Sequence, residues 1–272
     1  MRPWLPILAL GALGLASPAS ADVTARYAGT GKYGPTMSVA VDESGQVRAE
    51  AGPPNNASER LVLIRREGVD YISAADIQGR FVARADDLIA VANETIRASM
   101  PERAREGMRG FADIRFDIGA GGMETVGGRQ GRVYPITPIV PPPARAASGD
   151  DEADQEPEAM AAPAPLELVI SDDPELAPIG REMARLFEST TGPIEAVMGT
   201  RPAALGQIQE LLARGTLIRF TGEFRLRSVS TDAIAESAFV LPPGPVLTRA
   251  QLRARMPRPP RAADAGADRD ND

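Results

Sequence analysis

The strongest constraint on the fold is a period-two alternation of apolar with small or polar residues, which begins soon after residue 22. Met37, Val39 and Val41 follow this spacing, and it resumes at Val47 after the turn-forming residues 43–45. Successive side chains of a β-strand point to opposite faces of the sheet. The pattern therefore predicts an antiparallel hairpin with one apolar face.

The same alternation predicts strands along most of the chain. Turns between consecutive strands are expected at Glu67-Gly68 and at Thr221-Gly222, where glycine allows the backbone to reverse tightly. The expected strands cover residues 60–73 (two strands), 79–85, 111–118, 129–136, 166–171, 216–220, 224–230 and 238–245, the last as an edge strand stopped by proline.

Amphipathic helices are expected between these strands. Asp86 is the expected N-cap of the first, which places Ile89, Ala92 and Ile96 on one face. A helix is also expected over residues 203–214, with Gly215 as its C-terminal cap. The remaining expected helices follow Asp173 and cover residues 248–255.

Three carboxylates close together, Asp172, Asp173 and Glu175, raise the question of a cation site. An aspartate followed by proline and glutamate is also the signature of a helix start, because the aspartate caps the first free N–H groups. Because Pro178 has no backbone N–H to donate, we expect the regular helix to begin near Pro178, after a single turn at Asp173. We interpret the carboxylates as structural, with a cation site as the alternative.

The first residues have the layout of a secretory signal peptide. A basic Arg2 precedes an apolar run over residues 4–16, and Ala19-Ser20-Ala21 is a small-x-small cleavage signal. The apolar run is too short to span a bilayer of about 30 Å. We therefore expect residues 1–21 to be a cleaved signal peptide and the protein to be soluble in the periplasm, with no stable membrane insertion.

The remaining chain is expected to form a single domain, residues 22–256, with one interruption. Residues 137–165 are rich in proline, alanine and acidic side chains and have few apolar residues to bury, so we expect a disordered insertion. The same reasoning predicts a disordered tail over residues 257–272. With strands and amphipathic helices but no regular βαβ alternation, the fold class is α+β, an antiparallel sheet covered by helices.

Composition removes several kinds of chemistry. The chain has no cysteine and no histidine, so it has no Ser-His-Asp or Cys-His catalytic machinery and no zinc site of the usual kind. A net charge of −7 with few aromatic residues disfavours nucleic acid as a partner. We expect no cofactor, no metal site and no catalytic residue.

Three segments resemble the DUF4412 family of exported bacterial proteins. In the first, Gly128 and Tyr134 fit the family's Gly-x-x-Cys-x-x-Tyr strand, although Gly131 stands where many members have cysteine. In the second segment, the tryptophan that is common in the corresponding strand of the family is missing. The segments are "ETVGGRQGRVYPI" (124–136), "LELVISDDPELA" (166–177) and "LRSVSTDAIAESAFVLPPG" (226–244).

The resemblance implies a fold similar to the LolA/LolB-like lipoprotein carriers: a curved antiparallel sheet that forms an incomplete barrel closed over by helices. It also implies a concave apolar cavity for an acyl chain or another hydrophobic ligand. The ligand-lining candidates are apolar strand positions that would serve equally well as ordinary core: Met37, Val39, Val41, Leu61 and Leu63.

Two functions from different classes stay open at this point. The first is a non-enzymatic periplasmic binding or carrier module for a lipid, a lipoprotein or another hydrophobic ligand, which predicts an apolar cavity of a few hundred Å³ or more. The second is a structural or interaction protein of the cell envelope whose half-barrel is filled by its own side chains. A hydrolase built on two converging carboxylates is a third, weaker hypothesis.

Overall fold

The computed structural model describes residues 22–29, 34–53, 56, 59–101, 110–139 and 166–256. The expected signal peptide, residues 140–165 of the expected insertion and the expected tail lie outside these ranges. The first three residues of the expected insertion, 137–139, belong to a strand, so the predicted start at 137 was too early. Residues 137–139 pair with residues 115–117, whereas Ile136 pairs with both Ile118 and Leu166.

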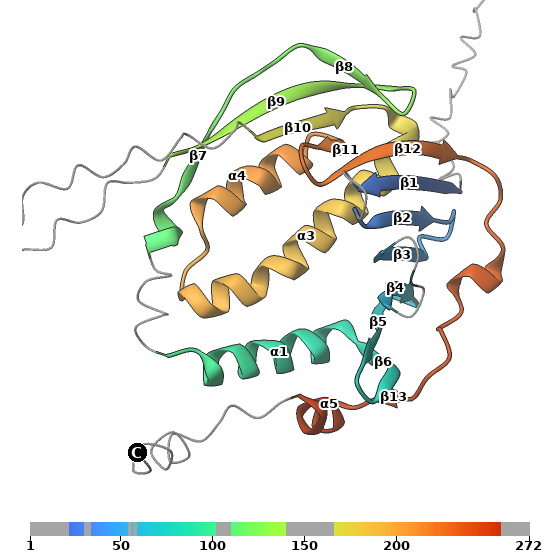
Figure 1. Ribbon diagram of the computed structural model, residues 1–272. Coiled ribbons are helices and arrows are strands. Elements are labelled where there is room, and N and C mark those ends of the chain that lie inside the picture. Colours follow the sequence, from blue (N-terminus) through green and yellow to red (C-terminus); the bar gives the residue numbers. More distant parts are fainter. Residues whose placement is uncertain are drawn as a thin grey trace, which may run out of the picture.

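One curved sheet dominates the described residues (Figure 1). It has thirteen strands in the order β13-β6-β5-β4-β3-β2-β1-β12-β11-β10-β9-β7, and β8 also pairs with β9. The strands are β1 (Val23–Gly29), β2 (Thr36–Val41), β3 (Val47–Gly52), β4 (Leu61–Arg66), β5 (Val69–Asp76), β6 (Gly79–Arg84), β7 (Arg115–Ile118), β8 (Met123–Val126), β9 (Arg129–Ile139), β10 (Leu166–Ser171), β11 (Thr216–Phe220), β12 (Phe224–Ser230) and β13 (Val246–Leu247).

The sheet is an open one, with β13 at one end of the strand order and β7 at the other. The predicted α+β class is confirmed, and so is the antiparallel pairing of neighbouring strands, except that β13 pairs with β6 in parallel. The predicted tight turns are also present. Glu67 and Gly68 have φ values of 53° and 75°, and Gly222 has a φ of 82°, as short hairpin turns require.

Helices lie inside the curve of the sheet (Figure 1). The α-helices are α1 (Ala85–Ser99), α3 (Ala177–Met198), α4 (Ala203–Leu212) and α5 (Arg249–Arg255), and the 3₁₀ turns are η2 (Gly110–Asp113), η3 (Pro174–Leu176) and η4 (Glu236–Phe239). No helix in the described ranges is long and apolar enough to cross a membrane.

The start of α3 follows the sequence prediction closely. Asp173 caps the single turn η3, and its side chain accepts a hydrogen bond of 3.0 Å from the Glu175 backbone N–H. The regular helix begins at Ala177, next to Pro178, where the missing N–H of proline leaves no bond unmade. The predicted short helix is also confirmed, since Thr248 forms a capping box with Gln251 at the start of α5.

Four local predictions were wrong. Residues 111–113 of the strand expected over 111–118 belong to the 3₁₀ turn η2, and β7 begins at Arg115. Asp86 lies in the first turn of α1, whose N-cap is Arg84. Gly215 does not cap α4, whose last residue is Leu212 and whose C-cap is Ala213. A Cβ atom at position 215 would lie 2.3 Å from the carbonyl oxygen of Ser171, so glycine allows a close approach of β10. Residues 238–245 form no strand: η4 occupies their beginning, and Pro245 accepts a hydrogen bond from Val82 that leads into β13.

The hydrophobic core has three parts, which follow the helices along the sheet. The largest lies between β1–β4 and the start of α3, where Leu176 and Ile179 are fully buried. The second lies between β9–β11 and α4, and the third joins β6, α1 and Leu252 of α5. Helix α3 therefore contacts the sheet through the first two clusters, and α1 contacts it through the third.

The β8–β9 hairpin packs against β10, β11 and β12. Its turn residue Gly127 lies against Leu226, and Gly131 lies against Val169 and Ile218. Arg219 of β11 also binds carboxylates of β8 and β10 at 2.7 and 2.8 Å. The close approach of β10 and β11 explains glycine at position 131.

Substitution of Gly131 by alanine is expected to destabilise the protein by about 1–3 kcal/mol, the usual effect of overpacking. A Cβ atom there would lie 2.8 Å from Val169 Cγ1 and 2.9 Å from the Ile170 carbonyl oxygen. Urea unfolding followed by circular dichroism measures the change. The matched control is Gly206→Ala in α4, where a Cβ meets nothing within 4 Å, and helix propensity predicts a gain of about 0.5–1 kcal/mol. Equal stability of Gly131→Ala and the natural protein would contradict the packing described.

Acid is expected to loosen α5 from α1. Hydrogen bonds from Arg253 and from Arg249 lower the pKa of Glu94 from 4.5 to about 2. A lowered folded-state pKa means that the stabilisation is complete above pH 4.5 and is lost as the pH falls through 2. Hydrogen-exchange protection of the α5 amides should therefore fall over this range. The variant Glu94→Gln should show weak, pH-independent protection of α5; an unchanged pH dependence in this variant would assign the effect to another group.

Candidate functional site

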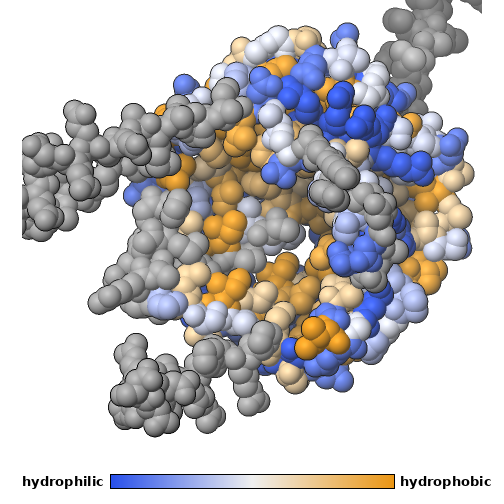
Figure 2. Space-filling view, in the orientation of Figure 1, coloured by the Kyte–Doolittle hydropathy of each residue, from blue (hydrophilic) through white to orange (hydrophobic). Residues whose placement is uncertain are grey.

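A cavity of about 470 Å³ lies between the sheet and helices α3 and α4. All fifteen residues that line it are apolar, and Figure 2 shows apolar residues gathered around a hollow on this side of the molecule. The lining residues are Met37, Val39, Phe116, Ile136, Leu166, Leu168, Met183, Leu186, Phe187, Leu205, Ile208, Leu212, Leu217, Phe220 and Phe224.

The strand register places the sheet side of this lining. Leu168 of β10 lies opposite Phe220 of β11, and Leu166 lies opposite Ile136 of β9. Because paired residues of neighbouring strands share a face, these side chains all point to the helices. Phe220 and Phe224 contact each other edge to face, with ring centroids 6.2 Å apart. The sheet wall of the cavity is thus built from long aliphatic and aromatic side chains.

The helix side of the lining follows helical periodicity. Met183, Leu186 and Phe187 lie on one stripe of α3, and α4 contributes Leu205, Ile208 and Leu212 at spacings of three and four. Both helices were expected from the sequence to be amphipathic. What the sequence did not indicate is that a space remains between them and the sheet.

Tyr27 fixes α3 to the sheet beside the cavity. Its side chain is 2% exposed, and its hydroxyl donates a hydrogen bond of 3.1 Å to the Leu217 carbonyl oxygen. The same hydroxyl lies 3.4 Å from the Met183 sulfur on α3. Burial raises the pKa of Tyr27 well above its ordinary value, because the phenolate would lose its hydration. This tyrosine is therefore a neutral hydrogen-bond donor at neutral pH.

Gln207 attaches α4 to the edge of the sheet. Its amide nitrogen donates to the Phe116 carbonyl oxygen, and its amide oxygen accepts from the Phe116 N–H, both at 2.8 Å. The side chain thus takes the place of a neighbouring strand along β7, which covers an edge that would otherwise be free to pair. Phe116 itself lines the cavity, so this pair of bonds also joins the sheet and helix walls at β7.

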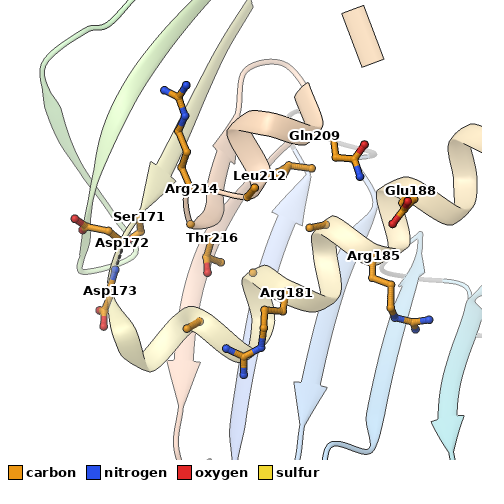
Figure 3. A pocket seen from close by; sticks show the side chains of 15 residues that line it. Ser171, Asp172, Asp173, Arg181, Arg185, Glu188, Gln209, Leu212, Arg214 and Thr216 are labelled. Carbon is orange, nitrogen blue, oxygen red and sulfur yellow. Dashed lines mark hydrogen bonds between the residues drawn. The ribbon is translucent and has the colours of Figure 1, made fainter. Parts of the chain in front are cut away.

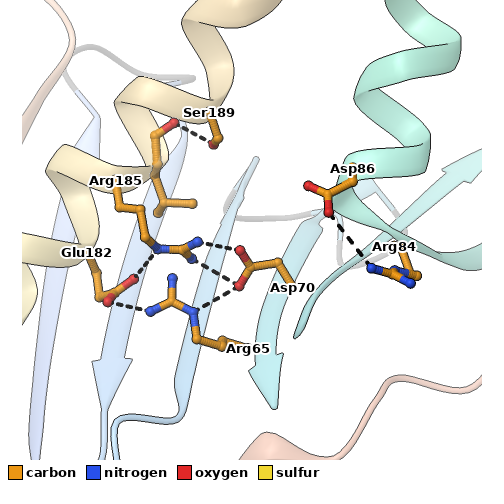
Figure 4. Close-up of polar contacts among 8 residues, drawn as sticks. Arg65, Asp70, Arg84, Asp86, Glu182, Arg185 and Ser189 are labelled. Atoms are coloured by element: carbon orange, nitrogen blue, oxygen red, sulfur yellow. Dashed lines mark hydrogen bonds and ion pairs between the residues drawn. The ribbon is translucent and has the colours of Figure 1, made fainter. Parts of the chain in front are cut away.

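Four charged side chains hold α3 to the β4–β5 hairpin (Figure 4). Arg65 binds Asp70 at 3.0 Å and Glu182 at 2.6 Å. Arg185 binds Glu182 at 3.1 Å and makes two hydrogen bonds to Asp70. Each carboxylate contacts both guanidinium groups, and Glu182 is only 13% exposed. This closed ring of opposite charges positions α3 over the sheet.

The lining candidates proposed from sequence are only partly brought together at the cavity. Met37 and Val39 line it, whereas Val41 and Leu63 are buried in the neighbouring core cluster. Leu61 is 44% exposed and is absent from the lining. The missed residues lie in β7, β9–β12, α3 and α4. Their apolar alternation was visible in the sequence, but nothing local distinguished a cavity wall from solid core.

Asp172 and Asp173 line a second pocket of about 510 Å³ near the start of α3 (Figure 3). Asp173 caps η3 and also accepts a hydrogen bond of 2.6 Å from Arg129, which binds Glu175 at 2.7 Å. Within the described ranges no group of three or more carboxylates has the arrangement of a metal site. The helix-start interpretation of Asp173 is confirmed.

Comparisons with known proteins identify no family. No family model matches the chain, and no curated protein matches it, so the resemblance to the DUF4412 family stays a prediction. Among solved structures the chain is similar to the crystal structure of MucB, with 16% identity, a TM-score of 0.30, and coverage of 82% of this chain and 58% of that one. The chain thus spans less than two thirds of that protein, and the TM-score is too low to support inference.

Replacing Asp70 by asparagine is expected to destabilise the protein by about 1–2 kcal/mol, because two guanidinium groups then share one carboxylate in a partly buried site. Urea unfolding measures this change. Asp86→Asn is the matched control: it removes a carboxylate whose ion pair with Arg84 is 3.9 Å long and exposed on both sides, and less than about 0.5 kcal/mol is expected. Equal effects of the two substitutions would show that the ring does not hold α3.

Proposed function

We propose that the protein is an exported periplasmic module that binds or carries a hydrophobic ligand, without catalysis. The observation that carries this proposal is the cavity of about 470 Å³ with an entirely apolar lining. Its volume is within the range of about 300–1,000 Å³ that is typical of small-molecule sites. Protein interiors are otherwise packed as densely as organic crystals, so a space of this size is not ordinary core.

The chemistry of the lining selects the part of a ligand that would enter. Burial of apolar surface contributes about 25 cal/mol per Å², whereas a charged or strongly polar group would find no hydrogen-bond partner among these side chains. An acyl chain or a comparable hydrocarbon fits both conditions. It would enter with its apolar end first, leaving its polar end outside the cavity.

The lining also suits ligands of varied shape. Met37 and Met183 have flexible, polarisable side chains that adapt to irregular surfaces. The aromatic residues supply large contact areas. We infer a site that recognises a class of hydrophobic molecules, in which a lipid or the acyl chain of a lipoprotein is the expected ligand. Periplasmic localisation rests on the signal-peptide pattern of residues 1–21.

The direct test is mass spectrometry of organic extracts from the protein, purified from the periplasm without detergent. A stoichiometric lipid or acyl species, absent from a control periplasmic protein prepared in parallel, is the expected result. Titration with a fluorescent fatty acid then measures affinity. A protein that carries no lipid and takes up no fatty acid would favour the alternative, an envelope protein that acts through its surface.

Filling the cavity is expected to abolish binding. Ile208→Trp adds an indole from α4 into the space and should weaken fatty-acid binding by at least tenfold, because the ligand and the new side chain compete for one volume. The matched control is Glu210→Trp, on the exposed side of the same helix, which should bind as the natural protein does. Thermal unfolding of both variants checks folding, and unchanged binding by a folded Ile208→Trp variant would place the ligand elsewhere.

A further inference from the structure

The face of the sheet turned away from the helices has a groove of about 500 Å³ that is rich in arginine. It crosses strands β12, β1, β2 and β3. Arg26 and Ser38 lie here because they alternate with the core residues Ala25, Tyr27 and Val39. The arginine and serine side chains of this groove therefore point away from the apolar cavity, and Met37 of β2 borders both spaces.

The strand register brings cations and hydroxyl groups to one level of this face. Arg26 of β1 lies opposite Ser38 of β2 on one side and opposite Ser228 of β12 on the other. Arg227 precedes Ser228, at a point where the β1–β12 register shifts. Thr36 also lines the groove. Arg26, Arg227 and three hydroxyl groups thus border the same space, which Glu50 and Arg60 also line.

The guanidinium groups of Arg26 and Arg227 have no carboxylate partner within the described part of the chain. Glu50, which also lines the groove, is bound by Arg48 at 2.5 Å and approached by Arg60 at 3.8 Å. Arg26 and Arg227 are exposed, and the described residues provide no ion pair or hydrogen bond for either guanidinium group. In a chain with a net charge of −7, this local excess of cations is a distinct feature.

Guanidinium groups beside hydroxyl groups are the donors that recognise phosphate and similar oxyanions, since the planar guanidinium donates two parallel hydrogen bonds to such groups. We propose that this groove binds a phosphate-type oxyanion through Arg26 and Arg227, with Ser38 and Ser228 as additional donors. The anion is either free phosphate or the headgroup of an anionic lipid, and the chemistry of recognition is the same. The site is independent of the apolar cavity.

The test compares the natural protein with Arg26→Gln/Arg227→Gln. Binding of inorganic phosphate is measured by calorimetry, and binding to vesicles of phosphatidylglycerol or of phosphatidylcholine is measured by co-sedimentation. The natural protein should bind phosphate, phosphatidylglycerol vesicles or both, with affinity that falls as salt is added. The double variant should bind at least about tenfold more weakly, as the loss of charge-assisted hydrogen bonds predicts.

The matched control is Arg66→Gln/Arg84→Gln, which removes the same charge from arginines that are 53% and 56% exposed and lie outside the groove. Its affinity should stay within about twofold of the natural protein. Binding to phosphate alone assigns free phosphate as the ligand, and binding to phosphatidylglycerol vesicles alone assigns the headgroup. No binding of either kind, or equal weakening in both double variants, overturns the proposal. Fatty-acid uptake, measured on the same samples, reports separately on the cavity.

Discussion

The structure depends on the attachment of α3 to the inner face of the sheet. A curved antiparallel sheet with one apolar face is stable only when another layer covers that face, and α3 is the longest helix available in the described residues. Its first part is anchored by Leu176 and Ile179, which are fully buried. The hydroxyl of Tyr27 and the ring formed by Arg65, Asp70, Glu182 and Arg185 then fix its position.

The cavity is a consequence of this geometry. A curved sheet and a straight helix cannot stay in contact along their full lengths, so the gap between them must be filled by side chains or remain. Near β1–β4 the gap is closed by core residues, whereas between β9–β12 and α4 it remains as an apolar space. The hydrogen bonds between Gln207 and Phe116 attach α4 to β7, so the helix wall and the sheet wall of the cavity are joined at β7.

The two faces of the sheet have opposite chemistry. The inner face is apolar around the cavity, and the outer face carries arginines and serines at the alternate positions of the same strands. Arg26 and Tyr27 are neighbours in sequence, yet the Arg26 side chain is exposed at the outer groove, whereas the Tyr27 hydroxyl contacts Met183 beside the cavity. Period-two alternation therefore separates two different surfaces by the thickness of a single strand layer.

Local patterns in the sequence predicted the strands of the first half, the turns at Glu67-Gly68 and Gly222, the helix start at Asp173 and the amphipathic character of α3 and α4. These features depend on neighbours within a few residues, through side-chain periodicity, capping and backbone conformation. The cavity, the ring around Asp70 and the bonds of Gln207 to Phe116 arise only when distant parts of the chain come together. Their partners lie about a hundred residues apart in the chain, and the space left between packed elements depends on curvature and register, which local alternation does not encode.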